Sequence, residues 1–313
     1  MPEVKKIATR EAYGNALAES GERYPDLYVL DADLAVATKT SVFRKKYPNR
    51  HINCGIAEAN MMGIAAGLSL VGAIPVASTF AMFAAGRAFE QVRNSIGYPN
   101  LNVKIGATHA GITVGEDGAS HQCNEDIALM RTIPGMTILS PSDAVEARDC
   151  VKAALDMEGP VYMRFGRAAV PVINDRPDYH FKIGKGEIVR EGSDVTIVAT
   201  GIMVNSALEA AELLADEGIF AEVINICTIK PLDVELLVKS AKKTGKLVTA
   251  EEHSIMGGLG GAVCEALSEV YSVPIYRIGV RDVFGESGSA NAMLKKYELD
   301  GKGVYRQIKK FLI

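Results

Sequence analysis

Residues 109–122 concentrate side chains that can transfer protons. The segment contains His109 and His121, the adjacent carboxylates Glu116 and Asp117, and three glycines. Histidine titrates near neutral pH and is the commonest general acid or base in enzymes. A lone histidine is more often a surface or hydrogen-bonded residue, but two of the five histidines flank this glycine-rich loop. We therefore predict a catalytic site that includes the loop.

Glu58 is a second candidate, because the sequence around it is apolar. Its neighbours at helical spacing include Met61 and Met62, and none of them can pair its charge. A lone buried carboxylate is costly, and such a group usually shifts its pKa or meets a ligand. The alternative is a glutamate that faces solvent at a helix N-terminus. The residues 56–72 are small and apolar on nearly every side, which predicts a buried helix.

Alternating strands and helices must position these groups. Strands are predicted near 26–36, 73–80, 101–110, 136–143 and 159–167, with helices between them. This alternation indicates a parallel sheet with helices on both faces, and such sheets bind ligands at the carboxyl ends of their strands. Several residues that could bind ligands or catalyse a reaction fall at or just beyond the predicted strand ends. We therefore expect them to lie together at one edge of the sheet: Asp31, Asp33, Ser78–Phe80, His109 and Arg164.

The chain of 313 residues is long enough for two domains. The alternation stops after residue 169 and resumes after 191, which predicts a first domain over 1–170, a linker over 171–190 and a second α/β domain over 191–313. The alternative is a long ordered loop within one domain. The sequence "GGLGGAV" at 257–263 fits neither G-x-G-x-x-G nor a Walker loop, so we interpret it as tight strand-to-helix packing.

Composition excludes several function classes. A net charge of −4 argues against nucleic acid as the main partner. The longest apolar stretch is interrupted by glycine and proline and is shorter than the roughly 20 residues that a membrane span needs. The charged N-terminus lacks the apolar core of a secretion signal. Five scattered cysteines are typical of a reducing compartment. We expect a cytoplasmic protein that binds neither nucleic acid nor membranes.

Three segments together resemble the C-terminal part of transketolase, and the resemblance covers almost the whole chain. They are "GIAEANMMGIAAGLSLVGAIPVASTF", "THAGITVGEDGASHQCNEDIALMRTIPGMTILSPSD" and "EEHSIMGGLGGAV". The resemblance implies a thiamine diphosphate pyrimidine-binding domain followed by a transketolase C-terminal domain, each with a mainly parallel sheet flanked by helices. The middle segment separates this family from the β chains of 2-oxo-acid dehydrogenases, which share the fold and an equivalent glutamate.

The resemblance implies thiamine diphosphate as cofactor. Glu58 matches the glutamate that hydrogen-bonds the aminopyrimidine ring and favours its imino form, which removes the proton from the thiazolium carbon. Phe80 and Phe83 match the aromatic wall against that ring, and Asp33 matches an acid near the cofactor. Gly86 stands where the family often has a third aromatic residue, so the wall here is expected to be thinner.

The same resemblance assigns substrate roles. His109 and His121 match histidines that bind substrate hydroxyls and carbonyls and relay protons to them. Asp117 matches the acid that recognises the hydroxyl next to the acceptor aldehyde. Arg10 and Arg164 match arginines that hold the sugar phosphate, a task that suits a bidentate guanidinium. One departure is Ala37, which stands where the family often has a phosphate-binding serine.

A larger departure is the lack of a Gly-Asp-Gly…Asn segment, which in the family binds the metal that holds the diphosphate. We therefore expect a split transketolase of the pentose phosphate pathway. This chain would self-associate as a dimer core, and a separate N-terminal subunit would complete a heterotetramer and supply most ligands for Mg²⁺ or Ca²⁺. The alternatives are a transketolase for another phosphosugar, a 2-oxo-acid dehydrogenase β chain, a deoxyxylulose-phosphate-synthase-like enzyme, and a non-catalytic orphan half.

Overall fold

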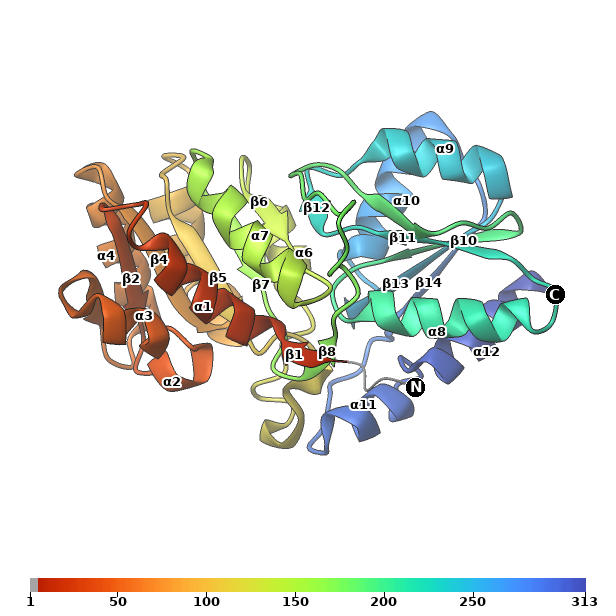
Figure 1. The fold of residues 1–313 in the computed structure, drawn as a ribbon, viewed down its shortest axis with the longest axis horizontal. Coiled ribbons are helices and arrows are strands. Elements are labelled where there is room, and N and C mark those ends of the chain that lie inside the picture. The colour runs from red at the N-terminus through yellow and green to blue at the C-terminus, as the bar shows by residue number, and fades with distance from the viewer. Residues whose placement is uncertain (1–4) are drawn as a thin grey trace.

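The computed structural model describes residues 5–313, so the first four residues of the predicted first domain lie outside it. Two α/β lobes lie side by side (Figure 1). The N-terminal lobe contains a seven-stranded sheet and the C-terminal lobe a five-stranded sheet. No helix among residues 5–313 is both long and apolar enough to span a membrane.

The seven-stranded sheet has the order β12-β6-β7-β5-β4-β2-β3 and is parallel except for the β12–β6 pair. Its register pairs Asp31 with Ser78, Phe80 with Thr108, and Ala107 with Arg164. The predicted site residues therefore lie at the carboxyl edge or just beyond it. The strands are β2 (Leu27–Asp31), β3 (His51–Asn53), β4 (Ile74–Phe80), β5 (Lys104–Thr108), β6 (Thr137–Leu139), β7 (Val161–Arg164) and β12 (Thr228–Lys230).

Helices cover both faces of this sheet, as the alternation predicts. Tyr13 and Val151 belong to the apolar core on one face, and Met61 and Ile127 belong to the core on the other. The first face is covered by α1 (Thr9–Ser20), α3 (Ser41–Lys46) and α7 (Ala144–Asp156), the second by α4 (Glu58–Leu70), α5 (Phe89–Gln91) and α6 (Asp126–Arg131). The short α2 (Ala35–Thr38) follows the carboxyl end of β2.

The prediction that helix 56–72 is buried nearly all round is wrong. Met61, Met62 and other residues on one side of α4 are buried, whereas Gly63, Gly67 and Leu70 are exposed. An added Cβ at either glycine would meet no atom within 4 Å. The helix packs on the sheet with one face only, and its apolar outer face is not covered by any segment among the described residues.

The helix expected between the strands predicted near 73–80 and 101–110 is irregular. Two π-helical segments, Phe83–Arg87 and Val92–Gly97, flank the single turn of α5. Such wide turns are rare and frequently lie at functional sites. The first of them carries Phe83 and Arg87, which both belong to the site described below.

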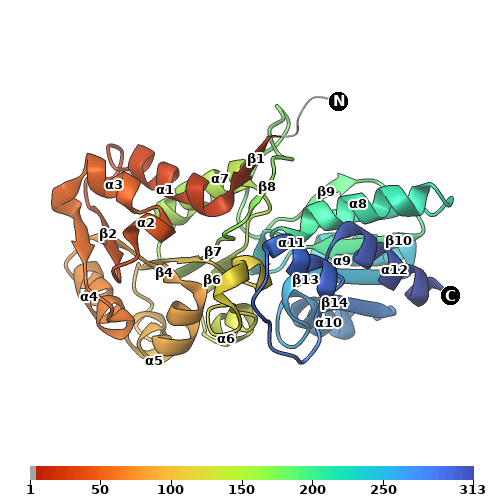
Figure 2. The same cartoon turned by 90° about the horizontal axis from the view of Figure 1, so that it is seen from below.

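The five-stranded sheet has the order β14-β13-β10-β11-β9 and is parallel except for β9. Helices α8 and α12 pack on one face and α9 and α10 on the other (Figure 1). Helix α11 adds Met293 to the core on the α8 side and lies beside residues 112–117 of the N-terminal lobe (Figure 2). The elements are β9 (Glu187–Arg190), β10 (Val195–Ala199), α8 (Met203–Ala215), β11 (Ala221–Asn225), α9 (Val234–Thr244), β13 (Leu247–Ser254), α10 (Leu259–Val270), β14 (Ile275–Val280), α11 (Ala290–Lys296) and α12 (Gly301–Leu312).

The predicted linker, residues 171–190, is flanked by regular structure. Its start belongs to β8 (Ala169–Pro171), which pairs with β1 (Lys6–Ala8) in a two-stranded sheet. Its end is β9, which already pairs with β11 of the C-terminal lobe. Only residues 172–186 lack helix and strand.

Strand β12 crosses between the lobes. The chain leaves β11 in the C-terminal sheet, and three residues later β12 pairs antiparallel with β6 of the N-terminal sheet. Next to it, Cys227 places its Sγ atom 3.2 Å from that of Cys150 on α7, and both thiols are buried. The N-terminal sheet therefore includes one strand from the C-terminal part of the chain.

Candidate active site

An aromatic cluster lies at the carboxyl edge of the first sheet. The rings of Phe80 and His109 stack with centroids 3.8 Å apart, and Phe83 stacks on Phe80 at 5.8 Å. His121 meets Phe83 edge-on at 5.5 Å. The end of β4, the end of β5 and the glycine-rich loop thus bring together two aromatic residues and both predicted catalytic histidines.

His109 is held as a neutral imidazole. An Nη1 proton of Arg10 is donated to His109 Nε2 over 3.3 Å, and Nδ1 lies 2.9 Å from Thr108 Oγ1. Arginine cannot accept a hydrogen bond, so Nε2 is the acceptor and Nδ1–H donates to the threonine. Burial, with the charges of Arg10, Arg167 and His121, lowers the pKa of His109 to about 3. Its backbone φ of 56° is uncommon outside glycine and frequent at functional sites.

Two guanidinium groups face the same region. Arg10 also donates to the carbonyl of Ala37 over 2.8 Å. Burial and then the charge of Arg167 lower the pKa of Arg10, so the two cations lie close together. Arg167 donates to Val114 O and lies 3.1 Å from a carboxylate oxygen of Glu116. Adjacent arginines of this kind favour an anionic ligand.

Arg167 was missed by the sequence reasoning, which chose Arg164 instead. Arg164 is 6% exposed, and its Nε donates to Asp126 Oδ2 over 2.9 Å while Nη2 donates to Glu252 O over 2.9 Å. These partners lie at the contact between the lobes, and among residues 5–313 Arg164 has no hydrogen bond to His109 or His121. Its position in the sequence could have indicated Arg167. Arg164 is the last residue of β7, whereas Arg167 lies beyond the end of that strand, where ligands of parallel sheets bind.

Glu58 is buried but not unpaired. It is 1% exposed, which rules out the solvent-facing alternative. Its Oε2 accepts a hydrogen bond from Arg87 Nη1 over 2.8 Å, and the Arg87 guanidinium lies 4.5 Å above the centroid of the Phe83 ring. Sequence reasoning missed this partner because it searched helical neighbours, whereas Arg87 lies 29 residues away, in the π-helical turn that follows β4.

The two aspartates at the end of β2 and just beyond it differ in exposure. Asp31 is fully buried, accepts from Leu34 N over 2.8 Å and lies 3.1 Å from His51 Nε2. Asp33 is exposed and accepts from Asn53 Nδ2 over 3.1 Å. A cavity of about 540 Å³ reaches both of them. Its cationic lining is Arg10, Lys39 and Arg44.

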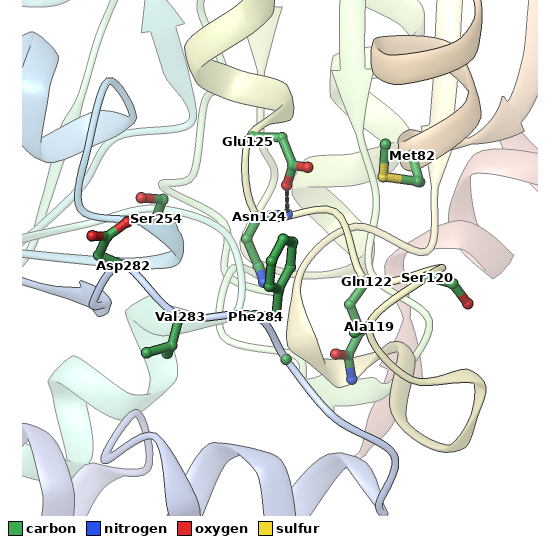
Figure 3. A pocket seen from close by; sticks show the side chains of 11 residues that line it. Met82, Ala119, Ser120, Gln122, Asn124, Glu125, Ser254, Asp282, Val283 and Phe284 are labelled. Carbon is green, nitrogen blue, oxygen red and sulfur yellow. Dashed lines mark hydrogen bonds between the residues drawn. The ribbon is translucent and has the colours of Figure 1, made fainter.

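A second cavity, of about 490 Å³, lies between the lobes (Figure 3). Met82, between the two phenylalanines in sequence, contributes one wall, and Glu125 another. Burial raises the pKa of Glu125, whose carboxylate accepts from Asn124 N over 2.6 Å. The C-terminal lobe closes the opposite side with residues that include Phe284, which is 86% exposed. This cavity adjoins the aromatic cluster through Met82.

The glycine-rich start of α10 packs tightly, as its sequence predicts. The amides of Leu259 and Gly260 donate to the carboxylate of Glu251 over 2.6 and 2.8 Å. A Cβ at Gly258 would lie 1.9 Å from that carboxylate. Burial raises the pKa of Glu251 to about 7. The helix start therefore binds a side chain of this protein.

The residues of this chain fit the aminopyrimidine of thiamine diphosphate. The buried carboxylate of Glu58 lies beside the aromatic wall of Phe80 and Phe83. The carboxylate can accept a hydrogen bond from a flat, nitrogen-rich ring, and the aromatic wall can stack on it. At Gly86, a Cβ would lie 2.4 Å from the methyl group of Met82. The glycine that makes the aromatic wall thinner therefore also leaves room for the Met82 side chain. No group of three or more His, Cys, Asp or Glu residues within 5–313 could hold a metal ion.

The fold and the site define a pyrimidine-binding α/β domain joined to a second α/β domain. Residues 5–172 match the pyrimidine-binding domain of transketolase, and residues 184–304 match the transketolase C-terminal domain. The chain belongs to the transketolase family.

Relatives of similar length support this membership. The chain is 50% identical over 301 residues to a "transketolase C-terminal section" of Methanocaldococcus jannaschii, covering 96% of this chain and 94% of that one. It is 45% identical to the 6-deoxy-6-sulfo-D-fructose transketolase subunit of Clostridium sp. strain MSTE9, with 95% and 92% covered. A solved split gene transketolase, described as an inactive β4 tetramer, is 57% identical with a TM-score of 0.91, covering 98% of each chain.

Longer family members share the fold. The transketolase of Leishmania mexicana is 26% identical with a TM-score of 0.81. The match covers 98% of this chain but only 46% of that one, so the chain corresponds to about half of such a protein.

Proposed function

We propose that this chain is the C-terminal subunit of a split transketolase. With a separate N-terminal subunit it transfers a two-carbon ketol unit between sugar phosphates, using thiamine diphosphate. The observation that carries this proposal is the buried Glu58 beside Phe80 and Phe83, with His109 and His121 in the same cluster. The N-terminal subunit would supply most of the ligands for Mg²⁺ or Ca²⁺.

Each side chain of the site has a role in the proposed reaction. Bound thiamine diphosphate supplies the nucleophilic carbon that receives the two-carbon unit. Glu58 holds a proton against the pyrimidine ring, and Phe80 and Phe83 fix the plane of that ring. His109 is neutral, so its Nε2 can accept a hydrogen bond from a substrate hydroxyl when that hydroxyl replaces Arg10. His121, half-buried at the cluster edge, binds a second substrate oxygen.

Recognition of the acceptor sugar uses the polar side of the site. Arg10 and Arg167 form the proposed phosphate clamp, with Arg167 taking the place that the sequence assigned to Arg164. Asp117 lies 3.9 Å from Arg167 Nη1 and is proposed to recognise the hydroxyl beside the acceptor aldehyde. Asp33 faces the cavity that Arg10 lines and is proposed to lie near the cofactor.

The proposed assembly is a heterotetramer of two such chains with two N-terminal subunits. The outer face of α4 supports association, because Leu70 and Val71 at its end are 73% and 80% exposed and Ile56 before it is 76% exposed. Exposed apolar side chains thus lie at both ends of this helix, and exposed apolar surface is typical of protein interfaces. A relative with 57% identity is described as a β4 tetramer, which supports self-association of this chain. We place the protein in the cytoplasm, since its five cysteines, all within residues 5–313, are free thiols.

The test is reconstitution. Ketol transfer from xylulose 5-phosphate to ribose 5-phosphate is measured with thiamine diphosphate and Mg²⁺, for this chain alone and for its complex with a chain carrying the Gly-Asp-Gly…Asn domain. We expect turnover in the mixture only. Turnover by this chain alone would contradict the need for a partner, and a stable but silent complex would contradict transfer between these two sugars.

A second candidate is ketol transfer to or from another anionic sugar. Ala37 offers only its carbonyl where the family often has a phosphate-binding serine, and Lys39 and Arg44 line the same cavity. Relatives at 45% and 38% identity are named for 6-deoxy-6-sulfo-D-fructose and apulose 4-phosphate. Comparing kcat/KM for these sugars with that for the pentose phosphates distinguishes the two candidates.

Replacing Arg167 by alanine should raise the KM for a phosphorylated acceptor roughly 10- to 100-fold, the loss of a charge-assisted hydrogen bond of about 1.5–3 kcal/mol. Activity with glycolaldehyde, which has no phosphate, should change little. Steady-state kinetics of the reconstituted enzyme with both acceptors measures the effect. Arg93→Ala is the matched control, because Arg93 is exposed and, among residues 5–313, its side chain bonds only its neighbour Asn94. Equal losses with both acceptors would remove the phosphate role.

A further inference from the structure

Arg87 forms a contact that resembles the one expected of a bound pyrimidine. Its guanidinium is flat and rich in N–H donors. One edge donates to the Glu58 carboxylate over 2.8 Å, and the group lies 4.5 Å above the centroid of the Phe83 ring. An aminopyrimidine bound by Glu58 and Phe83 would use the same carboxylate and the same aromatic surface.

We propose that Arg87 occupies the place of the cofactor's pyrimidine in the cofactor-free chain and swings out when thiamine diphosphate binds. This inference rests on the proposed function, because it assumes that Glu58 and Phe83 bind that ring. Arg87 bonds Oε2 of the carboxylate and lies over the ring of Phe83, so a pyrimidine bound to the same carboxylate and the same ring would displace the guanidinium.

The surroundings allow Arg87 to move. Its side chain is 50% exposed, and the Glu58 carboxylate is its only hydrogen-bond partner among residues 5–313. It ends the wide π-helical turn Phe83–Arg87 and follows Gly86, which carries no side chain. The guanidinium can therefore rotate into solvent without breaking another hydrogen bond. Glu58, at 1% exposure, cannot follow it.

The Arg87–Glu58 contact also stabilises the cofactor-free protein. A buried carboxylate without a partner is costly, and Arg87 supplies the partner until the cofactor arrives. A chain that is mostly in the Arg87-occupied state binds its cofactor with an affinity reduced by the fraction of molecules in the open state. Removing the guanidinium should therefore tighten cofactor binding while it destabilises the cofactor-free protein.

Calorimetric titration of thiamine diphosphate, with Mg²⁺, into the complex with the N-terminal subunit tests this inference. For Arg87→Ala and Arg87→Met we expect a Kd about tenfold lower than in the wild type, as for a site that is nine-tenths occupied. The melting temperature of the cofactor-free complex should fall, and the rise on adding cofactor should be larger. Arg93→Ala, on the same irregular segment, should leave both quantities unchanged.

The Glu58→Gln background separates competition from a general effect of charge. In that background, Arg87→Ala should give no further gain in affinity, because the ion pair is already lost. An unchanged or higher Kd for both Arg87 variants, with a wild type that binds, would overturn the inference and leave the proposed function intact. A wild-type complex that binds no thiamine diphosphate would overturn the proposed function, and the inference with it.

Discussion

Glutamine in place of Glu58 is expected to reduce the turnover of the reconstituted enzyme by roughly 10²- to 10⁴-fold, the usual contribution of proton transfer by a positioned side chain. The amide matches the carboxylate in shape but can neither hold the ring proton nor carry the charge. Arg87, the lost partner, is half-exposed and can turn to water. The kcat of ketol transfer from xylulose 5-phosphate to ribose 5-phosphate, at saturating cofactor, measures the effect.

Glu90→Gln is the control for that experiment. Glu90 lies on α5 near the same site, but it is exposed, and in the described part of the chain its carboxylate bonds only Gln91 and Asn94. It should retain wild-type turnover. The melting temperature of both variants checks that the fold survives. Near-normal turnover of Glu58→Gln would show that Glu58 is not the cofactor-activating carboxylate.

The largest effect on stability is expected from Asp126→Ala. Asp126 begins α6, is fully buried, and accepts hydrogen bonds from Arg164 Nε and Tyr162 Oη, both over 2.9 Å. Its removal takes away the carboxylate that is hydrogen-bonded to the buried Arg164 cation at the contact between the lobes. Breaking such a pair costs about 3–5 kcal/mol. Urea unfolding followed by circular dichroism would measure the free energy lost.

The chain contains a matched surface control for that variant. Asp156 also accepts hydrogen bonds from an arginine and a tyrosine, Arg23 and Tyr24, but its side chain is 50% exposed. Asp156→Ala should cost less than about 1 kcal/mol, as surface ion pairs do. Similar losses for the two variants would mean that burial does not determine the strength of the Asp126 contact.

Local sequence pattern predicted the parts of the site that depend on strand ends. Asp31, Phe80 and His109 come at or just after strands, and parallel register brings such ends together without further information. The arginines required more. Arg87 reaches Glu58 only because a π-helical turn follows β4, and Arg164 turns inward only because α6 offers Asp126. Neither relation is encoded within one turn of helix or one strand.

The surface of α4 shows the same limit from another side. When a helix is apolar on every side, its sequence predicts that every side is buried. The sequence cannot show whether the burying partner is the core of the same chain or the surface of another subunit. The end of the linker could not be predicted from the sequence for a similar reason. Strand β9 lacks an alternation of apolar and polar residues and is recognised only by its pairing with β11.

The crossing of β12 has a consequence for how this protein can be divided. Cutting the peptide within residues 172–186 would separate the lobes in sequence, yet the fragments would still be joined through the β6–β12 ladder. An N-terminal fragment alone would expose β6 as a bare edge, which invites aggregation. A C-terminal lobe exchanged with that of a relative would have to bring a strand that complements β6. We therefore expect that the two domains are exchanged between relatives only together, as a single unit.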